Sequence, residues 1–148
     1  AAPSSQAMRL SIPPGDTKHV LYVEDNPANV AFMRDVLGMF EAISLDVATS
    51  AEQAIEMAAA APPDLILMDI NLPGMSGIDA LHALRHRPET ARIPVIALTA
   101  AASERDRQRG REAGFYRYLT KPVRLHELVE VFEKTLSNRK AAKGEDKP

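Results

Sequence analysis

The sequence predicts an α/β fold in which helices cover both faces of a five-stranded parallel sheet. Five short apolar runs alternate with five helical patterns, an order typical of strand–helix–strand units with right-handed crossovers. Two of the runs, residues 65–68 and 95–98, are apolar at every position, as expected of parallel strands buried on both faces. The length of 148 residues suits one such domain with short tails.

The five predicted strands follow from these runs. The second and fifth runs alternate apolar and polar residues more than the others, which predicts strands nearer the edges of the sheet. In chain order the runs lie at residues 19–24, 44–48, 65–68, 95–98 and 116–119.

Capping signals open the first three predicted helices. Asn26 before Pro27 indicates an N-cap and a first helical position. Ser50 begins an Ala-rich helix, and Ser76 with Asp79 resembles a capping box at the start of the third.

Two further helices complete the pattern. Residues 103–113 form a highly charged segment that ends at Gly114, a typical C-cap. The last helix has an apolar face of 3.6-residue period, formed by Leu125, Leu128, Val129, Phe132 and Leu136. We therefore expect a domain over residues 18–138, after a linker-like leader (1–17) and before a polar tail (139–148).

Composition excludes several classes of function. The net charge of −2 and pI of about 6.1 provide no general attraction to nucleic acid or to an anionic membrane surface. The absence of cysteine excludes disulfides, thiolate metal sites and thiol catalysis. No stretch has the apolar length of a membrane span, and the N-terminal segment lacks the pattern of a signal peptide.

Polar side chains follow the apolar runs directly. The first run ends in Glu24 and Asp25, the third in Asp69, the fourth in Thr99 and the fifth just before Lys121. In open parallel sheets the working site lies at the carboxyl ends of the strands. We therefore expect three carboxylates, a hydroxyl and an ammonium group at one edge of the sheet.

This set of groups predicts phosphoryl chemistry. Clustered carboxylates repel one another unless a cation is present, and Mg²⁺ suits oxygen ligands with a phosphate oxygen nearby. A carboxylate beside Mg²⁺ and Lys121 can attack a phosphoryl group, because both cations neutralise negative charge. Asp69 would then form an aspartyl phosphate, and the Thr99 hydroxyl could bond a phosphoryl oxygen.

Four segments, VLYVEDNPAN, LILMDINLPGMSGID, IPVIALTA and YLTKPV, resemble the receiver (response-regulator) domain of two-component systems. The resemblance covers about residues 19–136. It implies a flavodoxin-like doubly wound (βα)5 fold with strand order 2-1-3-4-5. It also implies a signalling phosphoacceptor, and not a classical enzyme, that takes a phosphoryl group from phosphohistidine and promotes its own phosphorylation and dephosphorylation.

The resemblance assigns roles to individual residues. Asp69 matches the phosphoacceptor, and Asp25, Asp69 and the backbone carbonyl of Asn71 match the Mg²⁺ ligands. Glu24 matches the first acid of the pair, which acts through a metal-bound water; many relatives have Asp there. Lys121 matches the phosphate-binding lysine.

Further positions match the family's switching and tuning residues. Thr99 matches the hydroxyl that moves toward the phosphoryl group, and Tyr118 the aromatic residue that turns inward after it. Asn71 and Ala101 match positions that tune the lifetime of the acyl phosphate. The peptide bond between Lys121 and Pro122 matches one that is commonly cis.

The partners implied are a histidine kinase or a histidine phosphotransfer protein, without direct binding of nucleic acid or membrane and with a weak dimer as an option. The chain can be a stand-alone response regulator or a module of a hybrid histidine kinase. The segment DNPAN and the Pro/Ser-rich leader favour the hybrid module. Either arrangement implies a cytoplasmic domain, in the second case within a membrane-anchored kinase.

Three alternatives compete with this interpretation. A haloacid dehalogenase-type phosphatase also uses a strand-end Asp, Thr and Lys with Mg²⁺, but requires a second Asp where Asn71 stands. A binding module that keeps the fold without phosphorylation is disfavoured by the intact Asp69, Thr99 and Lys121. A dinucleotide-binding protein is disfavoured because residues 24–29 contain no glycine.

Overall fold

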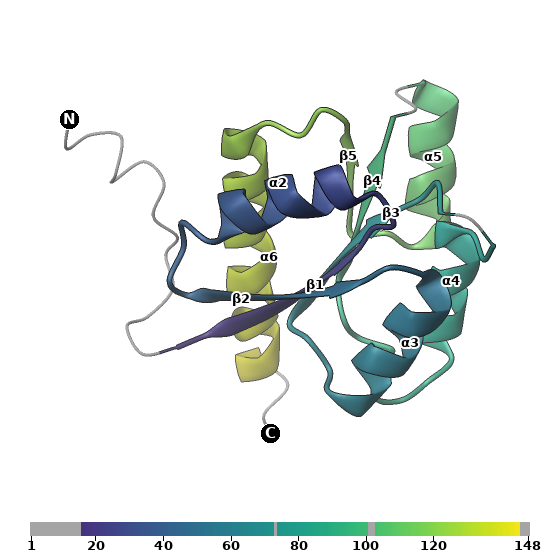
Figure 1. Cartoon of the computed structure of the whole chain (residues 1–148). Helices are drawn as coiled ribbons and strands as arrows, with labels where there is room; N and C mark the ends of the chain where they lie inside the picture. The colour runs from purple at the N-terminus through teal and green to yellow at the C-terminus, as the bar shows by residue number, and fades with distance from the viewer. Residues whose placement is uncertain (1–15, 73, 101–102, 146–148) are drawn as a thin grey trace.

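The computed structural model describes residues 16–72, 74–100 and 103–145. This part of the chain contains five strands that alternate with five helices (Figure 1), as the sequence predicted. The strands are β1 (Lys18–Val23), β2 (Ile43–Ala48), β3 (Leu65–Asp69), β4 (Val95–Thr99) and β5 (Arg117–Thr120). The helices are α2 (Pro27–Leu37), α3 (Ala51–Ala60), α4 (Gly77–Arg85), α5 (Glu104–Ala113) and α6 (Leu125–Glu145).

All five strands form one parallel sheet in the order β2-β1-β3-β4-β5. This confirms the predicted doubly wound fold and places β2 and β5 at the edges. Every residue of β3 and β4 is buried, because both strands have neighbours on each side and helices above and below. Because all the strands are parallel, the carboxyl ends of β1, β3, β4 and β5 lie together at one end of the sheet.

Helices cover the two faces of the sheet in two layers. Figure 1 shows α2 and α6 on one face and α3, α4 and α5 on the other. Successive residues of β1 point to opposite faces, so Val20 and Tyr22 pack with α2 and α6, whereas Leu21 and Val23 pack with α3 and α4. Full burial of an aliphatic or aromatic side chain contributes about 1.5–3 kcal/mol, so these two cores hold the strand ends in place.

The predicted helix caps are present. The side chain of Asn26 accepts a hydrogen bond from the backbone N–H of Ala28. Ser50 and Ser76 each accept one from the backbone N–H three residues later. Each N-cap satisfies an N–H group that lacks a partner within the helix.

The two ends of the chain differ in what the structure describes. The predicted leader, residues 1–17, lies outside the described residues except for its last two positions. Helix α6 continues past the predicted end of the domain, through residue 145. Residues 137–143 contain no proline and are rich in Ala, Lys and Arg, which favour helix. Across the described ranges, no helix combines the length and the apolar character that crossing a membrane requires.

Candidate functional site

The strand ends form a continuous polar rim. Asp69 and Thr99 are the last residues of β3 and β4. The backbone N–H of Glu24 donates to the carbonyl of Ala48 at 2.9 Å, and that of Lys121 donates to the carbonyl of Thr99 at 2.7 Å. Glu24 and Lys121 thus extend the sheet's hydrogen bonding by one residue, which fixes their backbone positions.

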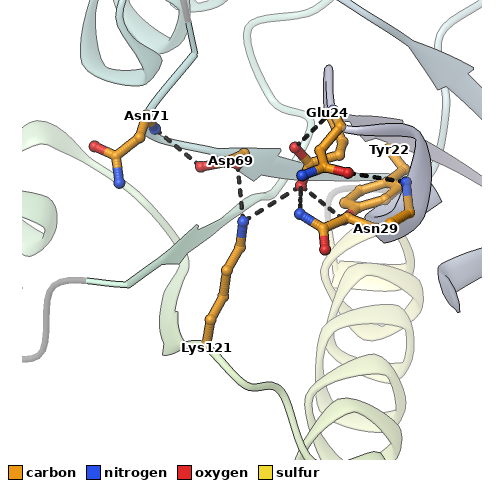
Figure 2. Close-up of polar contacts among 8 residues, drawn as sticks. Tyr22, Glu24, Asn29, Asp69, Asn71 and Lys121 are labelled. Carbon is orange, nitrogen blue, oxygen red and sulfur yellow. Dashed lines mark hydrogen bonds and ion pairs between the residues drawn. The ribbon is translucent and has the colours of Figure 1, made fainter.

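Lys121 lies between two buried carboxylates. Its Nζ donates to Oδ2 of Asp69 at 2.9 Å and to Oε1 of Glu24 at 3.3 Å (Figure 2). Asp69 is 5% exposed and Glu24 only 1%. A buried carboxylate is costly unless it is paired and hydrogen-bonded, so Lys121 stabilises both acids at this end of the sheet.

The pKa of Lys121 is raised above its ordinary value. Partial burial alone would lower this pKa, because desolvation disfavours the ammonium form. The hydrogen bond and charge of Asp69, together with those of Glu24, outweigh that effect. Lys121 is therefore a charged group at neutral pH.

Three carboxylates meet at a spacing that suits a cation. Glu24, Asp25 and Asp69 each offer one oxygen, and these oxygens lie within 4.8 Å of one another. Asp25 is exposed, so the group opens to solvent on one side. Carboxylate oxygens open to solvent are ligands that Mg²⁺ prefers, with water filling its other positions. The residues present therefore fit a magnesium ion.

The other predicted residues lie around this group. The backbone N–H of Asn71 donates to Oδ1 of Asp69 at 2.9 Å, while the Asn71 side chain is exposed. Thr99 is buried at the end of β4, and Tyr118 is half-buried in β5. The bond between Lys121 and Pro122 is cis. Ala101 lies outside the described residues.

Two side chains at this site had no predicted role. The hydroxyl of Tyr22 donates to Oε1 of Glu24 at 3.1 Å, and Nδ2 of Asn29 donates to the same oxygen at 3.2 Å. Burial raises the pKa of Tyr22, and the charge and hydrogen bond of Glu24 add to this effect, followed by the charge of Asp69. The available signal was a hydroxyl two residues before an acid, in a strand whose other residues from position 20 to 23 are aliphatic.

Sequence comparisons place the chain among signalling proteins. The family model described as "Response regulator receiver domain" matches residues 20–133. The polar-differentiation response regulator DivK of Brucella abortus is 37% identical over 124 residues, which cover 82% of this chain and 98% of that protein. A probable cyclic di-GMP phosphodiesterase of Vibrio cholerae is 38% identical over 122 residues. The match spans only 27% of that longer protein.

Solved structures give the same result. The receiver domain of a sensor histidine kinase from Pseudomonas aeruginosa, with a magnesium ion in its active-site cleft, matches with a TM-score of 0.75 and 32% identity. That match covers 82% of this chain and 98% of the other. The chemotaxis response regulator CheY4 of Vibrio cholerae matches with a TM-score of 0.74 and 25% identity, over 81% of this chain and 99% of CheY4.

These matches agree with the geometry of the site. The phosphatase alternative is disfavoured, since the family match points elsewhere and residue 71 is Asn and not the required second Asp. The fold, the acidic group at the strand ends and the family match lead to one conclusion: this chain belongs to the response regulator receiver domain family of two-component signalling systems.

Proposed function

We propose that this receiver domain accepts a phosphoryl group on the carboxylate of Asp69. The observation that carries the proposal is the 2.9 Å contact between Lys121 Nζ and Asp69 Oδ2 inside a group of three carboxylates. A nucleophilic carboxylate beside a fixed ammonium group is the arrangement that phosphoryl transfer needs. The donor is a phosphohistidine of a histidine kinase or of a histidine phosphotransfer protein.

The transfer exchanges one bond to phosphorus for another. A carboxylate oxygen of Asp69 forms a bond to phosphorus as the bond between phosphorus and the histidine nitrogen breaks. The imidazole keeps the proton on its other nitrogen and leaves as neutral histidine. Lys121 neutralises charge on the phosphoryl oxygens, and the Thr99 hydroxyl binds one of them. Bound Mg²⁺ supplies the remaining charge neutralisation.

Asp25, Asp69 and the backbone carbonyl of Asn71 would hold Mg²⁺ directly. Glu24 would contact it through a metal-bound water, and its carboxylate also accepts hydrogen bonds from neighbouring donors. Asn71 and Ala101 influence how long the acyl phosphate persists.

The response to phosphorylation passes through Thr99 and Tyr118. Attraction of the Thr99 hydroxyl to the phosphoryl group frees space beside β4 that the Tyr118 ring can fill. The surface formed by α5, β5 and α6 then changes for a partner. Tyr118 packs against the core beneath α4 and α5, which supports a coupling between this ring and that surface.

We also propose the protein in which this receiver acts. The receiver comprises residues 18–138 and acts in the cytoplasm as a module of a hybrid histidine kinase that passes its phosphoryl group on. Its similarity to the receiver domain of a sensor histidine kinase supports this arrangement. The match to DivK over nearly all of DivK's length supports the stand-alone alternative, and the residues encoded on either side of this chain would separate the two.

Labelling with acetyl phosphate tests the acceptor. In the presence of Mg²⁺, intact-protein mass spectrometry should show one added phosphoryl group, and Asp69→Asn should abolish it. Asp64→Asn is the matched control, because Asp64 binds the backbone N–H of His19 near the opposite ends of the strands. Full labelling of the Asp69 variant would refute the assignment. Mg²⁺-dependent hydrolysis of p-nitrophenyl phosphate that requires Asp69 would instead favour a phosphatase.

A further inference from the structure

Four donors surround the carboxylate of Glu24. Oε1 accepts hydrogen bonds from the hydroxyl of Tyr22 at 3.1 Å, from Nδ2 of Asn29 at 3.2 Å and from Nζ of Lys121 at 3.3 Å. Oε2 accepts one from the backbone N–H of Asn26 at 3.2 Å. Figure 2 shows Tyr22, Asn29 and Lys121 converging on Glu24 from β1, from α2 and from the loop after β5.

The Tyr22 ring is packed in the core, and its hydroxyl extends from there to the site. Tyr22 is 2% exposed and packs in the core with Met33, Leu37 and Phe132. Tyr22 and Glu24 are two residues apart in an extended segment, so their side chains lie on the same face of the sheet. A buried tyrosine hydroxyl requires a hydrogen-bond partner, and here that partner is a carboxylate of the proposed phosphoacceptor site.

The ammonium group of Lys121 lies closer to Asp69 than to Glu24. Its Nζ lies 2.9 Å from Asp69 Oδ2 but 3.3 Å from Glu24 Oε1. Oε1 already accepts from Tyr22 and Asn29, so less of its hydrogen-bonding capacity remains for the ammonium group. Glu also has one more rotatable bond than Asp, so its carboxylate needs outside contacts to remain in one place.

From these contacts we infer that Tyr22 and Asn29 are positioning residues of the phosphoacceptor site. They hold the Glu24 carboxylate in one place within the group of three acids, so that Lys121 stays bonded to Asp69. This inference rests on the proposed function, because it assigns the two residues to the same site. Neither residue touches the phosphoryl group; both act through Glu24.

Tyr22→Phe tests this role while the buried ring is retained. Isothermal titration calorimetry of the full chain should show Mg²⁺ binding weakened by up to about tenfold, the lower end of the loss that follows removal of an outer hydrogen-bond partner at a metal site, because Glu24 acts through a metal-bound water. Tyr116→Phe is the control and should leave Mg²⁺ binding unchanged. Tyr116 directly precedes β5, at the amino end of that strand, where its backbone N–H donates to the carbonyl of Val95.

A different result is expected if the Tyr22 hydroxyl has only a structural role in the core. If Tyr22→Phe lowers the free energy of unfolding in urea but binds Mg²⁺ as tightly as the wild type, Tyr22 only satisfies the core and the inference is overturned. Asn29→Ala provides a second variant in a half-buried position of the first turn of α2. It should weaken Mg²⁺ binding in the same direction, and an unchanged affinity would remove Asn29 from the role.

A double-mutant cycle identifies the residue through which Tyr22 acts. Against a Glu24→Asp background the shorter carboxylate recedes from the hydroxyl, so Tyr22→Phe should have no further effect on Mg²⁺ affinity. An undiminished effect in that background would contradict the pathway through Glu24. A wild-type chain that binds Mg²⁺ but is not labelled on Asp69 would refute the proposed function instead, which keeps the two failures distinguishable.

Discussion

The ring of Tyr118 lies directly against the backbone of Gly110. A β-carbon at position 110 would fall 2.6 Å from Cε2 of the ring and closer still to Cδ2. Gly110 belongs to α5 and Tyr118 to β5, so this contact joins two elements of the surface that we propose to change on phosphorylation. Only glycine leaves room for the ring in this position.

Gly110→Ala should therefore displace the Tyr118 ring. Overpacking costs about 1–3 kcal/mol, partly offset by the gain of about 1 kcal/mol when Ala replaces Gly within a helix. Urea denaturation measures the net change, and the aromatic NMR signals of Tyr118 report the move. In a Tyr118→Ala background the clash is absent, so Gly110→Ala should then stabilise the protein. Equal effects in the two backgrounds would contradict the steric relationship.

Lys121→Met should slow labelling by acetyl phosphate by about a hundredfold, the order expected when one fixed electrostatic group is lost from a transition state. In metal-free buffer it should also lower the free energy of unfolding, because Glu24 and Asp69 would then face each other without a cation. Added Mg²⁺ should restore part of that loss. Lys134→Met is the control, because Lys134 forms an exposed ion pair with Glu130 on α6, of a kind worth at most about 1 kcal/mol.

Mg²⁺ should stabilise the folded chain through the three carboxylates. A ligand at a hundred times its dissociation constant raises the free energy of unfolding by about 2.7 kcal/mol when it binds only the native state. Asp25→Asn should remove most of this increment while leaving metal-free stability equal or slightly higher, since one of three like charges is lost. Asp46→Asn, an exposed position on β2, should retain the full increment. Equal Mg²⁺ stabilisation of the Asp25 variant and the wild type would remove Asp25 from the ligand set.

Stability in metal-free buffer should fall as the pH rises above about 10. The pKa of Tyr22 is raised above its ordinary value of 10.0 in the folded chain, so this tyrosine ionises first in the unfolded state. Its contribution is therefore complete below pH 10.0 and is lost as the pH rises toward the folded pKa. Urea denaturation over the range of about pH 9 to 11 measures this decline. The free energy of unfolding should fall less steeply with pH for Tyr22→Phe than for the wild type. Parallel profiles for the two proteins would count against this coupling.

The sequence alone determined the elements and the edge where chemistry occurs. The apolar runs that became β3 and β4 needed no knowledge of the fold, because a strand buried on both faces is apolar at nearly every position. Asn26, Ser50 and Ser76 marked helix starts because an N-cap satisfies backbone groups within a few residues. Since strands of a parallel sheet end at a common edge, the placement of Asp69 and Lys121 at one site followed from order along the chain.

Only the tertiary structure decided how those side chains share their hydrogen bonds. Lys121 is 52 residues from Asp69 and 97 from Glu24, and its division between the two acids depends on packing across the sheet. The same holds for Tyr22, whose hydroxyl reaches Glu24 because its ring is fixed among side chains of α2 and α6, and for the space that Gly110 leaves to Tyr118. Periodicity and capping act over a few residues, whereas a contact between side chains far apart in the chain exists only once the core has set the separation of their backbones.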